Sequence, residues 1–436
     1  MTHADDIVLI RGRRVWDSRG RPTVEAEVHL ANGAVGRAIA PAGASRGRHE
    51  ALELRDGGSA FAGLDVVRAV AAVNECIGPS LVGVSVREQA AIDAALIALD
   101  GTPNKSRLGA NAIVAVSLAC LHAAAAATEV PLWSLLAAGR PVRLPVPEIQ
   151  IFGGGAHAAR RVDIQDFMIM CPSANSFAEA LDRTAEVYRA AGELLRARGL
   201  LAGTADEGGW WPNFPSNDAA LDFLVESIEC AGFVPGDEVW ISLDIAASEF
   251  FDGTHYRLAV DEQVLDRDGL CDLLGRWLDR YPILSIEDPL AEDDTDGMSA
   301  FTAAHGGRVQ IVGDDLLVTH PTRVSAAIAN DWCNAVLVKV NQVGTVSEAD
   351  AACRAAMAAG WGRLVSARSG ESEDVSIVHL ATGWDAGQIK VGSFARSERM
   401  AKWNELLRIE EAMGSAAVYA GFGALPTSVR RDTLRA

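Results

Sequence analysis

Three acidic residues stand at the ends of short apolar runs in the second half of the chain. Asp244 follows the run 239–243 and Glu287 follows the run 283–286. Asp314 comes two residues after a third run. Charges beside apolar strands are costly to bury unless they are paired or bind a metal. Any one of them is explained by a salt bridge or a helix cap. Three in register favour a hard cation such as Mg²⁺, which prefers oxygen ligands.

Two lysines belong to later runs of the same kind. Lys339 ends the run 335–338, and Lys390 lies within the run 388–391. Nearby cations lower the pKa of a lysine and favour a neutral base, whereas a second lysine can stay charged and hold a carboxylate. The alternative is that both lysines only neutralise the acidic strand ends, and their positions fit either interpretation.

The elements that must position these residues alternate between short apolar runs and helical segments. The six runs are 239–243, 283–286, 309–312, 335–338, 363–365 and 388–391. One amphipathic helix spans 270–281, and another is expected to begin at Ser347, with Asp350 completing a capping box, and to end near Gly360. Repeated strand–helix units predict a parallel sheet, here closed into a β/α barrel of the TIM type whose carboxyl-terminal face gathers the charged residues.

The first third of the chain is organised differently. Segments 23–30 and 34–40 predict two strands around the turn at Asn32 and Gly33, and three helices are expected afterwards, at 64–77, 88–99 and 110–127. The proline-rich stretch 140–147 resembles a boundary. We therefore predict an α/β protein with an N-terminal α+β domain (1–140) and a C-terminal barrel (141–436).

Charge and composition limit the possible partners. The chain has 39 basic and 58 acidic residues, which gives 39 − 58 = −19 and argues against nonspecific binding to nucleic acid or anionic membranes. The beginning does not resemble a signal peptide, and the apolar stretch 112–127 is better explained as a buried helix than as a membrane span. Seven scattered cysteines without a CxxC pair predict reduced thiols in a cytoplasmic protein.

Nine segments resemble motifs of the enolase family. They run in the family's order, cover nearly the whole chain, and together imply the family's two-domain fold. They are Asp17-Ser18-Arg19-Gly20, Asn104-Lys105-Ser106, Leu108-Gly109-Ala110-Asn111-Ala112, Asp206-Glu207-Gly208-Gly209, Ser285-Ile286-Glu287-Asp288-Pro289, Gly313-Asp314-Asp315-Leu316, Lys339-Val340-Asn341-Gln342, Arg368-Ser369-Gly370-Glu371 and Gly387-Gln388-Ile389-Lys390.

The resemblance implies a site with two Mg²⁺ ions. Asp244, Glu287 and Asp314 would bind the first, which also takes the substrate carboxylate. Ser45, in the loop 43–45, would bind the second together with the phosphate. The chemical difficulty is a weakly acidic C–H beside a carboxylate that is already negative, and two cations stabilise the resulting ene-diolate.

The same resemblance gives roles to the residues around the substrate. Lys339 would remove the proton from C2, and Lys390 would hold the carboxylate. Arg368 and Ser369 would bind the phosphate, together with Ser45. A lysine base beside Mg²⁺ is the arrangement that the enolase superfamily uses to form its ene-diolates.

The residues expected beside the departing C3 hydroxyl depart from the family pattern. Glu207 would attend the hydroxyl, with help from His157 and Gln165. Asp166 replaces the family's glutamate and is one methylene shorter. Ala367 replaces a histidine in Ser-His-Arg-Ser-Gly-Glu, and an alanine side chain can neither hydrogen-bond nor titrate. Positioned acid–base help is typically worth ~10²–10⁴-fold in rate, so drift explains Ala367 less well than a change in chemistry.

Other departures fall on the covering loops. Arg46, Arg160 and Arg161 replace residues that are usually small or polar, and Trp210 and Trp211 replace Phe-Ala. The arginines are suited to extra negative charge and the tryptophans to a flat group. Ordinary drift, with arginine for solubility and tryptophan for packing, explains both changes equally well.

Three functions follow from these observations. The first is dehydration of 2-phosphoglycerate to phosphoenolpyruvate by a carbon–oxygen lyase. The second is a paralogue in phosphonate or specialised metabolism, such as a carboxyphosphonoenolpyruvate synthase. The third is a noncatalytic binding protein, against which the retained carboxylates and lysines argue. A small anionic phospho- or phosphono-carboxylate substrate and the family's usual homodimer are expected.

Overall fold

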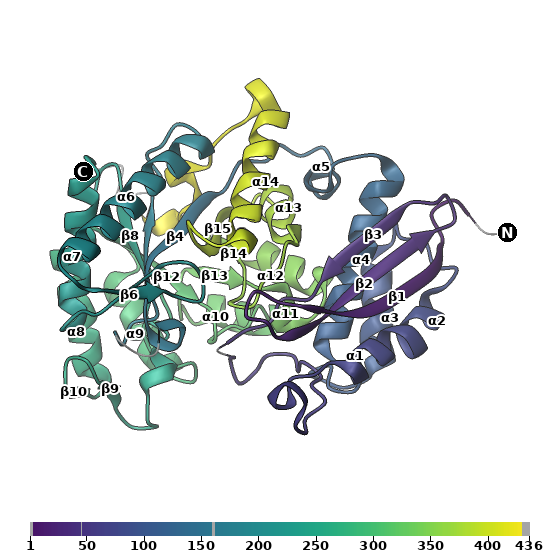
Figure 1. Ribbon diagram of the computed structural model, residues 1–436, viewed down its shortest axis with the longest axis horizontal. Coiled ribbons are helices and arrows are strands. Elements are labelled where there is room, and N and C mark those ends of the chain that lie inside the picture. The colour runs from purple at the N-terminus through teal and green to yellow at the C-terminus, as the bar shows by residue number, and fades with distance from the viewer. Residues whose placement is uncertain (1–2, 45, 159–161, 430–436) are drawn as a thin grey trace.

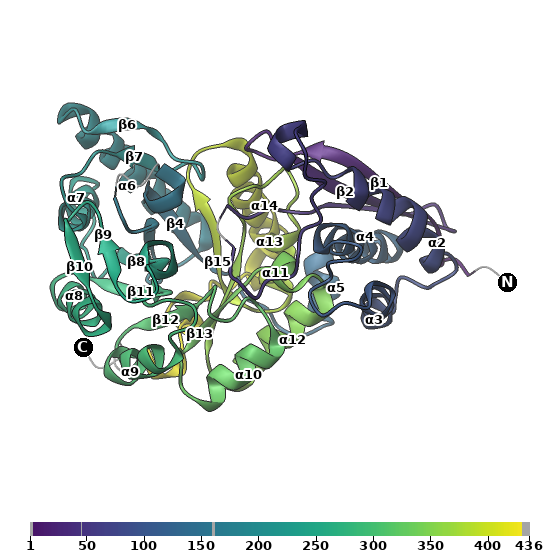
Figure 2. The same ribbon diagram turned by 90° about the horizontal axis from the view of Figure 1, so that it is seen from below.

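A computed structural model describes residues 3–44, 46–158 and 162–429, without the side chains of residues 156 and 157. Figure 1 shows two parts, a small sheet backed by helices at one end and a barrel wrapped by helices at the other. The same separation is visible from below in Figure 2.

The N-terminal sheet is antiparallel, in the order β1 (Ile7–Trp16), β2 (Pro22–Leu30), β3 (Val35–Ile39). Strands β2 and β3 and the turn between them confirm the predicted hairpin, in which Gly33 adopts φ +87°. Strand β1 was not predicted, because three arginines interrupt its apolar pattern and much of one face is exposed. The accompanying helical segments are η1 (Ala60–Gly63), α1 (Val67–Ala71), the π-helical η2 (Ala72–Ile77), α2 (Gly78–Leu81), α3 (Gln89–Asp100), α4 (Ala110–Thr128) and α5 (Leu132–Ala137).

Helix α4 forms the core of this part. It is long and apolar enough to cross a membrane by length and composition, yet 83% of its most apolar window is buried inside the protein. Helix α4 packs against β2 and β3, and the close approach requires a glycine at position 36. A Cβ there would overlap the backbone of Ala119 and Ala123. The prediction of a buried helix at 110–127 is therefore confirmed.

The barrel has eight strands and closes through a parallel pairing of β15 with β4. All six predicted runs are barrel strands, whereas β4 and β5 were missed. The strands in barrel order are β4 (Val146–Gly153), β5 (Asp166–Met170), β8 (Trp240–Asp244), β11 (Ile283–Glu287), β12 (Gln310–Gly313), β13 (Ala335–Val338), β14 (Gly362–Ser366) and β15 (Gly387–Ser393).

Helices and short ribbons surround the barrel (Figures 1 and 2). The helices are α6 (Phe177–Ala197), α7 (Asn217–Cys230), α8 (Arg267–Arg280), α9 (Thr295–His305), α10 (Pro321–Ala329), α11 (Val340–Val343), α12 (Val346–Ala358), α13 (Ser376–Gly383) and α14 (Ser397–Met413). The 3₁₀ segments are η3 (Gly155–Ala158), η4 (Ala247–Phe250), η5 (Gly414–Ala416) and η6 (Gly421–Ala424). The ribbon strands are β6 (Leu201–Thr204), β7 (Trp210–Pro212), β9 (Tyr256–Leu258) and β10 (Gln263–Leu265).

One barrel strand corrects the prediction of a purely parallel sheet. Strand β5 runs antiparallel to both β4 and β8. A parallel crossover normally needs a helix between its strands. The connection from β4 to β5 contains only the short η3 among its described residues, so the chain turns back directly.

The start of α12 corrects a second expectation. Thr345, not Ser347, is its N-cap and accepts a hydrogen bond from the amide of Glu348 at 3.3 Å. The hydroxyl of Thr345 also donates to the Glu348 carboxylate at 2.6 Å. Ser347 instead donates through its amide and hydroxyl to Asp93 on α3, at 2.8 and 2.6 Å. This pair fastens the N-terminal part to the barrel.

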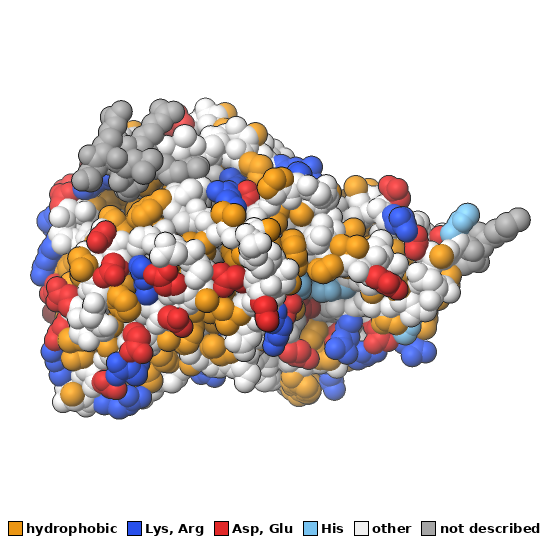
Figure 3. Space-filling view, turned by 90° about the horizontal axis from the view of Figure 1, so that it is seen from above, with side chains coloured by type: hydrophobic (Ala, Val, Ile, Leu, Met, Phe, Trp, Pro, Cys, Tyr) orange, Lys and Arg blue, Asp and Glu red, His pale blue; other side chains and the backbone are white. Residues whose placement is uncertain are grey.

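Figure 3 shows one face of the molecule, on which acidic and basic side chains are interspersed. The residues drawn in colour on that face form no continuous basic tract. The described residues of this face therefore offer no extended basic surface for an anionic ligand.

The close approach at position 36 predicts a stability effect. We expect Gly36→Ala to lower the free energy of unfolding by at least about 2 kcal/mol, because the new methyl group must displace helix backbone. Gly275→Ala is the control. It lies within α8, where an added Cβ meets only ordinary contacts at 3.6 Å, and we expect a gain of roughly 0.5–1 kcal/mol. Urea unfolding compares the two, and an unchanged midpoint for Gly36→Ala would contradict the prediction.

Candidate active site

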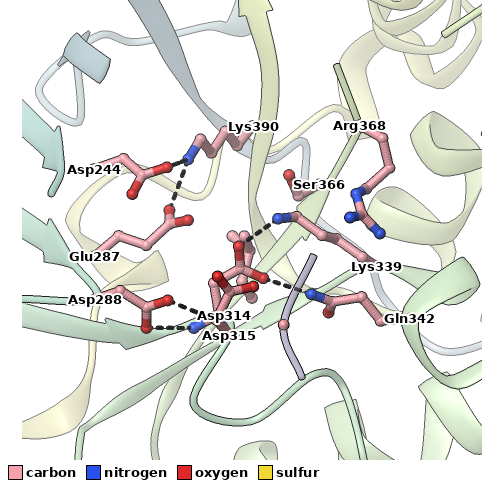
Figure 4. Close-up of polar contacts among 12 residues, drawn as sticks. Asp244, Glu287, Asp288, Asp314, Asp315, Lys339, Gln342, Ser366, Arg368 and Lys390 are labelled. Carbon is pink, nitrogen blue, oxygen red and sulfur yellow. Dashed lines mark hydrogen bonds and ion pairs between the residues drawn. The ribbon is translucent and has the colours of Figure 1, made fainter. Parts of the chain in front are cut away.

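The three predicted carboxylates lie at the mouth of the barrel (Figure 4). Asp244 and Glu287 end β8 and β11, and they are register partners. Asp314 directly follows β12. All three are buried, with 2–7% of their surface exposed. Asp166 joins them, because its residue pairs with Asp244 across the antiparallel strands β5 and β8.

Lys390 lies among these carboxylates. Its Nζ donates to Asp244 Oδ2 at 2.7 Å and to Glu287 Oε2 at 2.8 Å, and it lies 3.6 Å from Asp166 Oδ2. Burial acts against the lysine's charge, but the carboxylates outweigh it and raise its pKa well above the ordinary value. Burial and repulsion from Asp244 likewise raise the pKa of Glu287.

Lys339 lies on the other side of the same group and forms an ion pair with Asp314. Burial opposes its charge, but the Asp314 carboxylate prevails and the pKa of Lys339 is raised. The sequence predicted a lowered pKa for the base. The direction differs because the Asp314 carboxylate outweighs burial and the nearby charges of Arg368 and Lys390, all three of which lower the pKa. Asp314 also accepts a hydrogen bond from Gln342 Nε2 at 2.8 Å.

A second group of acidic residues overlaps the predicted ligand set only at Asp314. Among the described residues, Asp288, Asp314 and Asp315 form a candidate metal site in which one oxygen from each lies within 4.8 Å of the others. The oxygens of Asp288, however, accept hydrogen bonds from the backbone amides of Asp314 and Asp315, at 2.9 and 2.8 Å (Figure 4). Asp288 therefore orients the turn after β12.

Two buried side-chain oxygens beside the predicted carboxylates lack hydrogen-bond donors within the described part of the chain. They are Glu287 Oε1 and Gln165 Oε1. Gln165 Nε2 donates to Asp244 at 3.0 Å, so its free oxygen belongs to the same site. Unsatisfied buried oxygens beside three carboxylates are suited to a hard divalent cation.

Eight of the predicted residues line a cavity of about 20 Å³, whereas Glu287 and Asp314 are not part of its lining. This volume holds about one water molecule. The predicted residues in its lining are Gln165, Asp166, Glu207, Asp244, Lys339, Arg368, Ser369 and Lys390. Ala367 lines it as well, which places the missing imidazole position inside the site.

Glu207 reaches the cavity from the connection between β6 and β7. The chain there passes very close to the segment after β15, and Ser393 N donates to Glu207 O at 2.9 Å. Gly208 has φ +97°, and a Cβ at this position would lie 2.6 Å from Ala395 O. The glycine after Glu207 is thus required by the backbone path that brings the carboxylate to the site.

Arg368 and Ser369 lie across the cavity from the carboxylates. Glu50 holds the Arg368 guanidinium with two contacts of 3.1 Å, and Asn341 Oδ1 accepts from it at 3.1 Å. Burial opposes the charge of Arg368, but Glu50 outweighs it and raises the pKa. Arg19, from the N-terminal part, donates to Ser369 Oγ at 3.2 Å.

Some expected site residues lie outside what the structure describes. They are Ser45, Arg160, Arg161 and the side chain of His157. Of the loop substitutions that the structure does describe, Arg46 lies 4.0 Å from Glu53 and is 41% exposed. Glu53 is buried and also pairs with Arg55 at 2.9 Å.

Trp210 packs within the protein. Its ring stacks on Tyr188, with centroids 4.6 Å apart and planes 17° apart, and its Nε1 donates to Tyr188 O at 2.8 Å. The Arg196 guanidinium lies 4.9 Å from the same ring. The packing explanation for Trp210 is supported, because its ring is already covered by residues of α6.

Several site residues were missed by the sequence reasoning. Gln342 and Arg19 lie inside the quoted segments 339–342 and 17–20, so the signal was present but no role was drawn from it. Glu50 had no comparable signal. It follows no predicted strand, and its contact with Arg368 joins positions 318 residues apart.

A second polar layer lies below the charged one. Ser242 and Gln388 precede Asp244 and Lys390 by two positions, so they face the same side of their strands at the next level. Glu148 is buried beside Ser242. Ser242 Oγ donates to Glu148 at 2.7 Å, and the amides of Gln310 and Gln388 bond reciprocally at 2.9 and 2.8 Å. Burial raises the pKa of Glu148 to about 6.

Comparisons with known proteins agree with this architecture. Residues 7–136 match the family model "Enolase, N-terminal domain", and residues 141–427 match "Enolase, C-terminal TIM barrel domain". The chain belongs to the enolase family. It is similar to Enolase 1 of Desulfitobacterium hafniense (strain Y51), with 48% identity over 421 residues, which cover 96% of each chain. The enolase resemblance and the fold predicted from the sequence are thereby confirmed.

Glu148, in the second polar layer of this enolase-family barrel, predicts that the free energy of unfolding depends on pH. The pKa of Glu148, about 6, lies above the ordinary 4.5, so its stabilising contribution is complete below pH 4.5 and is lost as the pH rises through 6. The loss is about 2 kcal/mol. We expect Glu148→Gln to gain about this much free energy of unfolding relative to the parent between pH 4 and 7.

Urea unfolding at pH 4, 5.5 and 7 measures the difference. Glu193→Gln is the surface control, since Glu193 is 61% exposed in an ion pair with Arg189. A parent-to-variant difference that stays constant with pH would refute the assigned ionisation of Glu148.

Proposed function

We propose that the protein dehydrates 2-phosphoglycerate to phosphoenolpyruvate, as a carbon–oxygen lyase of the phosphopyruvate hydratase type. The observation that carries this proposal is the placement of Lys339 and Lys390 against three buried carboxylates, opposite Arg368 across one cavity. The family membership supports the same reaction. A phosphorylated carboxylate needs cations at both of its ends, and this site provides them.

Mg²⁺ is the proposed cofactor, with two ions in each site. Asp244, Glu287 and Asp314 would hold the first ion, which their oxygen chemistry and the orphaned Glu287 Oε1 support. Ser45 would take part in holding the second. When bound, these ions supply positive charge that stabilises the ene-diolate and favours the neutral form of a nearby lysine.

Lys339 is the proposed base for the C2 proton. Its ammonium must first lose a proton, and the ion pair with Asp314 opposes this loss until other positive charge satisfies that carboxylate. Lys390 stays charged, since two carboxylates hold it at 2.7 and 2.8 Å, and it orients the substrate carboxylate. The charged groups around each lysine thus assign it a different role, with Lys339 as the base and Lys390 as the cation that binds the substrate carboxylate.

The remaining roles concern the phosphate and the C3 hydroxyl. Arg368 and Ser369, with Ser45, bind the phosphate. Glu207 donates the proton with which the C3 hydroxyl leaves as water. His157, Gln165 and Asp166 assist Glu207 at the C3 hydroxyl. This group is smaller than in the family pattern, because Ala367 replaces a histidine. We expect departure of the hydroxyl to be the step most affected by Ala367.

The alternatives receive less support. The phosphonate hypothesis depended partly on tryptophans that stack on a flat group, and the ring of Trp210 is occupied by Tyr188 and Arg196. The similar protein also carries the name enolase. A noncatalytic role would leave buried charges without a function that offsets their desolvation cost.

We also propose a cytoplasmic homodimer that binds a small anionic substrate and no nucleic acid, with domains at 1–140 and 141–436. All seven cysteines are free, which agrees with a reducing compartment. The family models match on the two sides of the proposed domain boundary.

The first test uses purified protein with Mg²⁺ and 2-phosphoglycerate. We expect absorbance at 240 nm to rise as phosphoenolpyruvate forms, and Lys339→Ala to lower kcat by at least ~10²-fold because the base is lost. Lys105→Ala is the matched control, since Lys105 is also a buried, ion-paired lysine but contacts Glu348 at 3.0 Å. We expect it to keep the parent's activity.

NMR of the C2 proton separates the two halves of the reaction. Exchange of this proton without product would show that proton removal works and that a different leaving group must be sought. Absence of both turnover and exchange would refute Lys339 as the working base for this substrate.

Ala367→His tests the altered side of the site. We expect the variant to raise kcat by about 10²-fold if the lost imidazole limits departure of the hydroxyl. Ala367→Phe fills the same position without a titratable group, and we expect no gain from it. An equal kcat for parent and Ala367→His would contradict the assignment, because the missing group would then be irrelevant to the slow step.

A further inference from the structure

Three backbone carbonyls of the segment 368–372, those of Arg368, Ser369 and Ser372, accept hydrogen bonds from α14. Arg399, in the first turn of that helix, donates from Nη1 to Arg368 O at 2.7 Å and from Nη2 to Ser369 O at 2.7 Å. The same Nη1 donates to Val391 O at 2.8 Å. One guanidinium therefore joins the segment after β14 to the end of β15. Figures 1 and 2 both show α14 beside these strands.

Lys402, one turn further along α14, holds the far end of the segment. Its Nζ donates to Ser372 O at 2.7 Å and forms an ion pair with Glu371 Oε2 at 2.9 Å. Glu371 Oε1 in turn accepts the backbone amide of Arg368 at 2.9 Å. The conformation of Arg368 is thus fixed at its carbonyl by Arg399 and at its amide through Glu371.

Both cations are completely buried, with 0% of their surface exposed. Burying charge is costly unless hydrogen bonds and opposite charges compensate for it. The backbone also makes room for Arg399: Gly392 has φ +115°, and a Cβ there would lie 3.1 Å from Arg399 Cδ. This local structure is built around the arginine.

We propose that Arg399 and Lys402 are positioning residues of the phosphate subsite. By holding the carbonyls of residues 368, 369 and 372, they keep negative oxygen dipoles directed away from the phosphate. The side chains of Arg368 and Ser369 then remain directed to the cavity, whose lining includes both residues. The inference rests on the proposed function, because it assumes that phosphate binds to Arg368 and Ser369.

Arginine is needed at position 399 because of its geometry. A guanidinium is planar and presents several N–H donors in a fixed fork, whereas an ammonium is a compact point charge. The three carbonyls that Arg399 binds come from two separate strand ends. Lysine keeps the charge but presents its donors from a single nitrogen and lacks the fork that reaches both strand ends, so Arg399→Lys isolates the positioning effect from the charge.

The test measures binding of inorganic phosphate to the full-length protein by calorimetry, in the presence of Mg²⁺. We expect Arg399→Lys and Lys402→Met to weaken phosphate binding about 10-fold and to raise KM for 2-phosphoglycerate similarly, with kcat less affected. Mg²⁺ affinity should stay within about twofold of the parent, since the carboxylates lie on other strands. Arg408→Lys is the matched control on α14, as Arg408 is 66% exposed and pairs with Glu405.

Arg368→Gln separates failure of this inference from failure of the proposed function. If Arg368→Gln loses phosphate but Arg399→Lys and Lys402→Met bind it like the parent, the positioning role is wrong. If Arg368→Gln itself binds phosphate normally, the proposed phosphate subsite fails and the inference falls with it. Parallel losses of phosphate binding, Mg²⁺ binding and thermal stability would also overturn the inference, because they indicate a general structural role.

Discussion

Everything at the barrel mouth depends on how three buried carboxylates are kept stable beside one another. Asp244, Glu287 and Asp314 repel each other in surroundings that desolvate them. Lys390 bridges the first two and Lys339 pairs with the third. A closed barrel makes this possible, because its parallel strands end at one face and bring charges from distant segments together.

The opposite side of the site depends on backbone groups and on contacts between the two parts of the molecule. Glu50 and Arg19 reach Arg368 and Ser369 from the N-terminal part. The antiparallel domain is therefore more than a neighbour of the barrel. It supplies partners for Arg368 and Ser369, where we propose that the phosphate binds, while α14 holds the same segment through Arg399.

The substitutions relative to the family pattern differ in their physical consequences. The large ring of Trp210 packs inside the fold against Tyr188 and Arg196. Ala367 lines the cavity, where no larger side chain replaces the missing imidazole at that position. A change that is absorbed by packing affects stability, whereas one that removes a group from the cavity affects chemistry.

The sequence by itself determined the barrel, six of its strands and the charged strand ends, because apolar runs and the residues that follow them are local features. The antiparallel β5 was decided by its short connection to β4. The Thr345 cap was a local feature, because Thr345 and Glu348 also form a capping-box pattern, which competed with the one that begins at Ser347. Tertiary structure alone assigned Glu50 to Arg368 and Arg399 to the carbonyls after β14. These contacts join residues separated by 318 and 31 positions. Chain spacing gives no register for such pairs, so only folding brings their atoms within hydrogen-bond distance.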